Sequence, residues 1–399
     1  MQAFCENSCT KSRFLLFFMY LCSVMTDIII GFDAKRIVRN GTGLGSYGRT
    51  LVNDLARQQA LQLRLYAPDE GRADLRSQIV ERPNVCFSFA GRKGLGAAWW
   101  RMSGMVEDLR RDGVQLYHGL TGELPIGIRK SGIRSVVTIH DLIFLRHPEF
   151  YHWVDTKIYV WKFRQTLKEA DHIIAISECT KRDIMELGGV GEDKISVIYQ
   201  SHAPRFSAEV SQQLQEEVRK HYQLPRRFIL SVGSIEARKN ILQAVKALPM
   251  LPADISLVLV GRHTKYADVV ADYAQKRGLS QRVVMVHGVP DRHLPAFYAL
   301  AESFVYPSVY EGFGIPIIEA ISCGLPVVAC TGSCLEEAGG PDCYYVAPND
   351  IEGMATAISH TLRGTNGREE RITRSQQYIR RFEGTDVASQ VADLYRRLL

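Results

Sequence analysis

The residues whose types and spacing are best suited to chemistry lie between Tyr306 and Cys330, in the sequence YPSVYEGFGIPIIEAISCGLPVVAC. The pattern predicts a buried strand that ends at Tyr306, a glycine loop, a helix over 315–323 and then another strand. Gly312 and Gly314 let the backbone approach a ligand without a Cβ in the way. Because the N–H groups at a helix N-terminus attract negative charge, this loop predicts an anion site.

Two carboxylates bracket the glycine loop. Glu311 precedes Gly312, and Glu319 lies within the predicted helix, with seven residues between the two glutamates. Carboxylates accept hydrogen bonds from hydroxyl groups, so their position beside an anion site suggests a phosphorylated sugar or a nucleotide as ligand. The alternative is an ordinary crossover between two strands, in which neither glutamate contacts a ligand.

A second loop follows another predicted strand, in the sequence SVGSIEARKN over 231–240. Gly233 ends the strand, and Arg238 and Lys239 come just before a helix that we expect Asn240 to cap. Two cations at this position can clamp a diphosphate. A solvated basic pair is the alternative.

Three further strand ends carry candidate residues. His140 and Asp141 follow a strand in TIHDL, where an imidazole could bind a sugar hydroxyl or transfer a proton; the alternative is a histidine that only satisfies the strand terminus. Arg262 and Val289 follow two strands of the second half, and their backbones could line a nucleobase slot.

The sequence NGTGLGSYG over 40–48 contains a literal GxGxxG motif, and Asp69 lies roughly twenty residues further on. A nicotinamide site is disfavoured, because about ten residues separate the motif from the first strand, whereas that motif follows its strand directly. We expect a mobile loop in which Gly43 and Gly45 face a cleft. An ordinary surface loop is the alternative.

Strand and helix alternate along the whole chain, which predicts an α/β protein with two doubly wound, Rossmann-like domains facing a cleft. The unbroken apolar runs indicate parallel strands that are buried on both faces. A loop and a polar helix over 200–225 mark the linker, and we expect the tail after 351 to be helical. The predicted segments are an extension over 1–24, an N-terminal domain over 25–205, a C-terminal domain over 206–380 and a final helix over 381–399.

Composition narrows the classes of function. The chain has 399 residues, 46% of them hydrophobic, and a net charge of +6 without a long basic run, so nucleic-acid binding is not expected. Nine cysteines without a CxxC pair predict reduced thiols in a cytoplasmic protein. No cluster has the spacing of a metal site.

The apolar run over 14–25 follows two basic residues, as in a signal peptide. It is short for a membrane span, and no cleavage site follows. We therefore expect the natural start at Met25, with a short membrane-associating helix as the alternative. A basic and aromatic patch formed by Arg92, Lys93, Trp99, Trp100 and Arg101 could contact an anionic membrane. The alternative is an ordinary helix, expected over 99–111, with core tryptophans.

With these residues in place, the chain from Met25 onward resembles the GT4-type, group 1 glycosyltransferases of the GT-B architecture. EGFGIPIIE resembles the E-x7-E element of that family, GSIEARKN its diphosphate segment, and GTGLGSYGR and TIHDLIFLRHPEF its amino-terminal loop and histidine loop. The resemblance implies a retaining transferase that uses a nucleotide-sugar donor. It also implies that the last helix crosses back to the first domain.

The resemblance implies roles for individual residues. The implied catalytic residues are His140, Glu311, Arg238 and Lys239. The implied donor-binding residues are Gly43, Gly45, Gly233, Arg238, Lys239, Arg262, Val289, Glu311, Gly312, Phe313, Gly314 and Glu319, and Tyr47, His118 and Asp141 are candidates on the acceptor side. Glu311 would contact the sugar and Glu319 the ribose.

We expect mannose transfer from GDP-mannose to a saccharide or lipid-linked acceptor in polysaccharide synthesis, with UDP-sugars as the next alternative. No metal or other cofactor is expected, since Arg238 and Lys239 can meet the charge of the leaving diphosphate and the chain has no D-x-D motif. The remaining alternatives are a nucleotide-sugar epimerase or hydrolase, a nicotinamide oxidoreductase and a non-catalytic sugar-binding subunit. The expected location is cytoplasmic, with peripheral contact to the inner face of the membrane, and the oligomeric state is left open.

Overall fold

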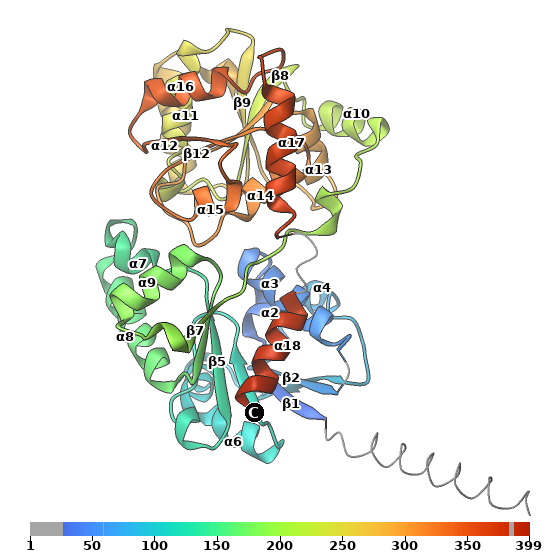
Figure 1. The fold of residues 1–399 in the computed structure, drawn as a ribbon, viewed down its shortest axis with the longest axis vertical. Coiled ribbons are helices and arrows are strands. Elements are labelled where there is room, and N and C mark those ends of the chain that lie inside the picture. Colours follow the sequence, from blue (N-terminus) through green and yellow to red (C-terminus); the bar gives the residue numbers. More distant parts are fainter. Residues whose placement is uncertain (1–26, 59, 383–386) are drawn as a thin grey trace, which may run out of the picture. The chain divides into compact units, whose positions relative to one another are not determined.

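The computed structural model describes residues 27–58, 60–382 and 387–399, which form two parallel sheets flanked by helices (Figure 1). Contacts divide the chain into two compact units. Unit 1 comprises the described part of Met1–Thr138 together with Gln165–Ile173 and Ala388–Leu399, and unit 2 comprises Ile139–Arg164 and the described part of Ile174–Val387. The expected extension over 1–24 and the start at Met25 lie outside the described residues.

The first sheet has seven strands in the order β3-β2-β1-β4-β5-β6-β7. Ile30 of β1 pairs in parallel register with Leu63 of β2 and Leu116 of β4. The strands are β1 (Ile28–Asp33), β2 (Leu61–Ala67), β3 (Val85–Phe89), β4 (Leu116–Gly119), β5 (Arg134–Ile139), β6 (His172–Ala175) and β7 (Ile195–Val197).

The second sheet has six strands in the order β10-β9-β8-β11-β12-β13 and lies in unit 2. Its strands are β8 (Arg227–Val232), β9 (Ile255–Val260), β10 (Val283–Val286), β11 (Ser303–Tyr306), β12 (Val327–Cys330) and β13 (Tyr344–Val346). Neighbouring residues of one strand pack in opposite cores: Phe228 and Leu230 on one face, Ile229 on the other. Burial on both faces explains why these strands read as unbroken apolar runs.

Helices connect the strands in both units. They are α2 (Lys35–Arg39), α3 (Gly43–Leu55), α4 (Ala73–Arg76), α5 (Gly94–Trp99), α6 (Met105–Arg111), α7 (Ile143–Arg146), α8 (Trp153–Glu169), α9 (Glu178–Gly188), α10 (Gln212–His221), α11 (Ile241–Ala247), α12 (Lys265–Lys276), α13 (Leu294–Leu300), α14 (Ile315–Ser322), α15 (Leu335–Gly339), α16 (Ile351–Ser359), α17 (Arg368–Ile379) and α18 (Val387–Leu398). The 3₁₀ turns are η2 (Ile128–Lys130), η3 (Pro148–Phe150), η4 (Glu192–Lys194), η5 (Pro204–Phe206), η6 (Ala237–Lys239), η7 (Leu248–Met250) and η8 (Ser280–Arg282).

The structure corrects three sequence expectations. The helix expected over 99–111 is interrupted by a π-helical turn, η1 (Trp100–Gly104), between α5 and α6. The tail is not helical throughout, because turns over 360–367 separate α16 from α17. Gly43 and Gly45 lie inside the first turn of α3, so the expected mobile loop is a helix start.

The strand order of each sheet reverses at a switch point, which lies between β1 and β4 in the first sheet and between β8 and β11 in the second. In such sheets the connections on either side of the switch point leave to opposite faces, and a crevice opens at the carboxyl ends of the two strands. In unit 2 the segments that follow β8 and β11 carry Arg238, Lys239 and Glu311. The fold therefore directs attention to this pair of loops.

Candidate active site

The two loops at the unit 2 switch point meet in a buried charge cluster. Glu311 Oε1 accepts hydrogen bonds from Lys239 Nζ at 2.5 Å and from Arg238 Nη1 at 3.0 Å. Lys239 also donates to the hydroxyl of Tyr306, the last residue of β11. The loop after β8 therefore supplies the cations, and the loop after β11 supplies the carboxylate.

The charges in this cluster stabilise one another. Burial alone would raise the pKa of Glu311, but Lys239 and Arg238 outweigh that effect, and the pKa falls to about 2. Burial lowers the pKa of Lys239 while Glu311 raises it, and the net change is upward. All three groups are therefore charged at neutral pH, and Glu236, whose carboxylate lies 3.4 Å from Arg238 Nε, adds a second acidic residue. Nη2 of Arg238 has no acceptor among the described residues and remains available to an anion.

The loop that follows Glu311 offers unpaired backbone donors. In the described part of the chain, the N–H groups of Gly312, Phe313, Gly314 and Ile315 have no acceptor. Three of them directly precede α14 and Ile315 is its first residue, where the helix dipole also favours an anion. These four donors supply the anion-binding geometry that the glycine pattern predicts.

Gly312 is required by close packing. A Cβ at this position would lie 1.8 Å from the carbonyl oxygen of His140, which no other residue could tolerate. The carbonyl of Gly312 in turn accepts hydrogen bonds from Ser177 Oγ at 2.6 Å and Thr180 Oγ1 at 3.2 Å. These contacts, all within unit 2, bring the histidine loop against the glycine loop.

Phe313 contributes only its backbone to this loop. Its side chain is 2% exposed and packs in an aromatic cluster with Tyr199 and Phe382. The ring therefore anchors the loop to the core while the N–H group stays available.

His140 lies beside the glycine loop, and its ring is oriented by a neighbour. Nδ1 lies 3.0 Å from the side-chain amide nitrogen of Gln200, and this contact fixes the orientation of the ring. The adjacent Asp141 caps the backbone N–H of Ile143. Burial raises the pKa of Asp141, although Arg238 and Lys239 act in the opposite direction. The electrostatic influence of those cations shows that Asp141 shares the environment of the charge cluster.

Glu319 lies on α14 and has a different environment from Glu311. It accepts a hydrogen bond from Tyr298 at 2.9 Å, and none of the described lysines or arginines forms a salt bridge with it. Burial raises its pKa to about 7, and Arg205 lowers it only partly. Near neutral pH this group therefore exists as a mixture of acid and carboxylate.

The remaining unit 2 candidates lie on neighbouring strand ends. Gly233 has a φ of +144°, and its carbonyl would be 1.8 Å from a Cβ at Gly261, so the two backbones touch. Arg262 is exposed and contacts Glu236, and Val289 is partly buried. Asn240 does not cap α11 with its side chain as expected: it donates instead to the carbonyl of Pro348 and to Gln243.

The unit 1 candidates occupy less accessible positions. Gly45 packs against the carbonyl of Asn40, with 1.9 Å to a Cβ at that site, whereas Gly43 has open space around it. His118 is fully buried, and its ring nitrogens contact the hydroxyls of Tyr395 and Thr138. Tyr47 also contacts Thr138. Tyr47 and His118 thus belong to an interior network, and their acceptor role stays a prediction.

Sequence reasoning missed the residues at the switch point of unit 1. Asp33 ends β1, Glu123 follows β4, and both contact Arg101, which is mostly buried on η1. Lys35 lies close by, and its pKa is lowered by burial and by Arg101. The signal was an aspartate at the end of a buried strand, which the pattern FDAK contains. Tyr306 and Gln200 were also missed, because only the fold brings them to Lys239 and His140.

The aromatic patch proposed for membrane contact is only partly exposed. Trp100 is 2% exposed and belongs to the core, and Arg101 is held by Asp33, whereas Trp99 is 55% exposed. The core interpretation is therefore right for Trp100. Among the described residues no helix combines the length and apolar character needed to cross a bilayer.

Neither a cluster of metal-binding type nor a disulfide is found among the described residues. The cysteines that the structure describes as free are Cys86, Cys179, Cys323, Cys330, Cys334 and Cys343.

Comparison with known proteins defines the class. The family model described as "Glycosyltransferase Family 4" matches residues 41–201, and that described as "Glycosyl transferases group 1" matches residues 215–378. The O-antigen chain mannosyltransferase B of Escherichia coli is 30% identical over 381 residues, which cover 90% of this chain and 96% of that protein. The chain therefore belongs to the GT4 glycosyltransferase family of GT-B architecture.

Solved structures share the fold. Sucrose-phosphate synthase from Thermosynechococcus elongatus aligns with a TM-score of 0.74 and 21% identity, covering 93% of this chain and 99% of that one. Anabaena HepE in complex with UDP and glucose aligns with a TM-score of 0.71 and 17% identity, with the same coverage.

Proposed function

We propose that this glycosyltransferase moves mannose from GDP-mannose to a saccharide or lipid-linked oligosaccharide, with retention of anomeric configuration and without a metal ion. The observation that carries the proposal is the charge cluster of Arg238, Lys239 and Glu311 at the unit 2 switch point. The similarity to an O-antigen mannosyltransferase over 90% of the chain supports mannose and polysaccharide synthesis.

The chemistry of glycosyl transfer fits these residue types. As the bond to the anomeric carbon breaks, the sugar becomes oxocarbenium-like and the leaving diphosphate gains negative charge. Arg238 and Lys239 are already ordered by Glu311, so they can meet that charge without reorganisation; one such preorganised donor is typically worth roughly 3 kcal/mol. The unpaired N–H groups from Gly312 to Ile315 add donors of the same kind. No second carboxylate is assigned as nucleophile, which favours front-side attack.

The other donor-site roles follow from the same placement. Glu319 is a candidate for the ribose hydroxyls, because a hydroxyl can donate to its carboxylate. His140, oriented by Gln200, is a candidate beside the transferred sugar. In unit 1, Asp33 and Glu123 are carboxylates at a switch point and can accept hydrogen bonds from acceptor hydroxyls.

The first alternative is a UDP-sugar donor, because HepE, which shares the fold, was solved with UDP and glucose. An epimerase or hydrolase would use the same donor site without an acceptor. A nicotinamide oxidoreductase is disfavoured, since α2 (Lys35–Arg39) separates the literal GxGxxG from β1 and Gly45 is needed for packing.

A thermal-shift panel of GDP, UDP, ADP and their sugars tests the donor, because a ligand that binds only the folded state raises the melting temperature. We expect GDP and GDP-mannose to give the largest shifts. A larger shift with UDP-sugars would identify a UDP-sugar as the donor instead of GDP-mannose. No shift with any nucleotide would overturn the proposed site. Release of GDP without an acceptor would favour the hydrolase.

We further propose that α8 provides the peripheral contact with an anionic membrane. Its exposed face carries Trp153, Val154, Ile158 and Trp161, at 71%, 53%, 45% and 46% exposure. Lys157, among other basic residues, lies on the same exposed side of the helix. An apolar stripe with tryptophans and flanking lysines is typical of a helix that lies in the interface of an anionic bilayer.

Co-sedimentation with vesicles tests this contact. Trp153→Ser/Trp161→Ser should lose binding to phosphatidylglycerol vesicles. The matched control, Met250→Ser/Val269→Ser, removes two exposed apolar side chains outside α8 and should bind as the unaltered chain does. Equal binding by both double variants would contradict the contact.

A further inference from the structure

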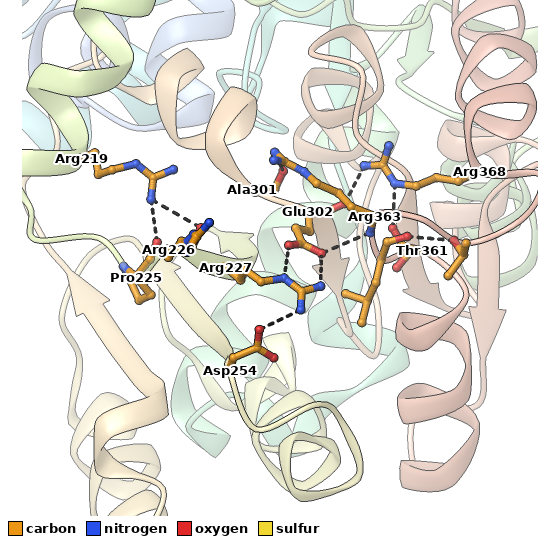
Figure 2. Close-up of polar contacts among 12 residues, drawn as sticks. Arg219, Pro225, Arg226, Arg227, Asp254, Ala301, Glu302, Thr361, Arg363 and Arg368 are labelled. Carbon is orange, nitrogen blue, oxygen red and sulfur yellow. Dashed lines mark hydrogen bonds and ion pairs between the residues drawn. The ribbon is translucent and has the colours of Figure 1, made fainter.

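A basic hollow lies at the end of the second sheet that is opposite the charge cluster. Its volume is about 770 Å³, within the range of small-molecule sites. Its lining residues include Arg219, Arg226, Arg227, Glu302 and Arg363, which Figure 2 labels. Leu224 completes the lining. Arg227 is the first residue of β8, and Glu302 directly precedes β11. The hollow therefore lies at the amino ends of the two strands whose carboxyl ends lead to the candidate active site.

The one carboxylate of the hollow is already neutralised. Glu302 is 2% exposed and receives Nε and Nη2 of Arg227 at 2.7 and 3.0 Å, as well as the backbone N–H of Arg363 at 3.2 Å (Figure 2). Nη1 of Arg227 donates to Asp254 at 2.8 Å. Arg227 is thus fully engaged, and Glu302 has little capacity left for another cation.

Three other guanidinium groups keep free donors. Arg219 uses only Nη1, toward the carbonyls of Pro225 and Arg226, and Arg363 uses only Nη2, toward the carbonyl of Ala301. The side chain of Arg226 has no partner anywhere in the described part of the chain, and Nε and one terminal nitrogen of both Arg219 and Arg363 are also unpaired there. Buried Leu224 adds an apolar wall. These nitrogens belong to residues that line the hollow, so they are available to a ligand.

The charge of the lining residues indicates the ligand. Four arginines line the hollow, and Glu302 and Asp254, which both bind Arg227, offset two of them, so two positive charges remain. These charges favour an anionic ligand such as a phosphate compound. A guanidinium group can bind two phosphate oxygens in a bidentate fork. Three arginines can therefore bind two linked phosphate groups more completely than a single phosphate ion. We propose that this hollow is a second anion site of unit 2, for a ligand with two linked phosphate groups.

This site is separate from the proposed donor site. β8 begins at Arg227 and ends just before the segment that carries Arg238 and Lys239, and β11 runs in parallel from Glu302 toward Glu311. The two anion sites therefore occupy opposite ends of the same pair of strands and share no residue. Ligands of doubly wound sheets usually bind at the carboxyl ends, so the family fold alone does not account for this hollow.

Calorimetric titration with inorganic pyrophosphate tests the proposal. The variant is Arg226→Gln/Arg363→Gln, because both side chains are exposed and neither holds a strand. The matched control, Lys276→Gln/Arg277→Gln, removes two charges from the exposed end of α12. We expect the variant to bind pyrophosphate at least about tenfold more weakly than the control, which should bind as the unaltered chain does.

In a second series, GDP is added to saturation, so that it occupies the proposed donor site and leaves the second anion site open. Binding of pyrophosphate that persists with GDP and disappears in the variant supports the proposal. Equal binding by variant and control, or no binding by the unaltered chain, overturns it. Circular dichroism checks that the variant is folded.

Vesicles distinguish the source of the phosphate groups. Phosphatidylcholine vesicles that carry a lipid diphosphate should recruit the control but not the variant if the ligand is a lipid headgroup. Recruitment of neither, with pyrophosphate bound in solution, assigns the site to a free diphosphate compound.

Discussion

The two ends of the second sheet each hold a buried glutamate among cations, and they are built differently. At the amino end, Glu302 is saturated by Arg227 and a backbone N–H group, and it ties together the starts of β8 and β11. At the carboxyl end, Glu311 shares one oxygen between Lys239 and Arg238, beside unpaired N–H groups. The first carboxylate completes its own neutralisation, whereas the second holds two cations ready for another anion. The number of ion pairs alone would not distinguish a structural ion pair from a binding site.

The largest expected effect comes from the carboxyl end. Lys239→Ala should lower transfer by roughly 10²- to 10³-fold, because a preorganised donor to the leaving group is lost. Arg238 still neutralises Glu311 in this variant, so we expect it to fold. Sugar transfer measured with the donor from the nucleotide panel checks the loss, with Lys276→Ala as an exposed lysine control. Full activity in Lys239→Ala would show that the cluster is not the site.

The corresponding change at the amino end should affect stability instead. Glu302→Ala leaves Arg227 without its buried acceptor and should lower the free energy of unfolding by about 3 kcal/mol. Transfer per folded molecule should be unchanged. Urea denaturation measures the difference, and Glu369→Ala, which removes an exposed glutamate beside Arg368, should change stability by less than about 0.5 kcal/mol. If Glu302→Ala lost sugar transfer but kept its stability, the two ends of the sheet would not differ in role as we propose.

Glu319 adds a pH dependence. Its folded pKa of about 7 lies above the ordinary value of 4.5, so between these values the folded state binds more protons than the unfolded state. Its contribution to stability is full below about pH 4.5 and is lost as the pH rises through about 7. Because the group is partly exposed, Glu319→Gln should be more stable than the unaltered chain by about 2 kcal/mol at about pH 8 and equal to it at about pH 4.5. Urea midpoints at both values check this, and the same difference at both would contradict the assignment.

The smallest effect belongs to the spare arginines of the amino end. In the absence of ligand, Arg226→Gln/Arg363→Gln should change the free energy of unfolding by no more than about 0.5 kcal/mol, since neither side chain supports a strand. Thermal unfolding in phosphate-free buffer measures it. A decrease in the free energy of unfolding as large as that of Glu302→Ala would show that these arginines have a structural role like that of Arg227.

The sequence predicted the strands of both sheets closely because their apolar runs are buried on two faces and leave a strong pattern. It predicted the charge cluster because glycine, carboxylate and basic residues each follow a strand. It missed the π-helical turn at Trp100, since no residue pattern distinguishes it from an α-helix. It could not anticipate the contact between His118 and Tyr395, which lies 277 residues away in sequence, and the role of His118 toward the sugar acceptor stays a prediction.

The sequence by itself determined the family, the parallel α/β character and the loops that carry chemistry, because these depend on local pattern and spacing. Only the tertiary structure decided which charges meet. Lys239 and Glu311 are 72 residues apart, and they pair because the order of the sheet makes β8 and β11 neighbours. The same strand order brings Arg227 to Glu302, 75 residues away, at the other end. Strand order depends on long-range packing, so a linear pattern of residues cannot specify these pairs.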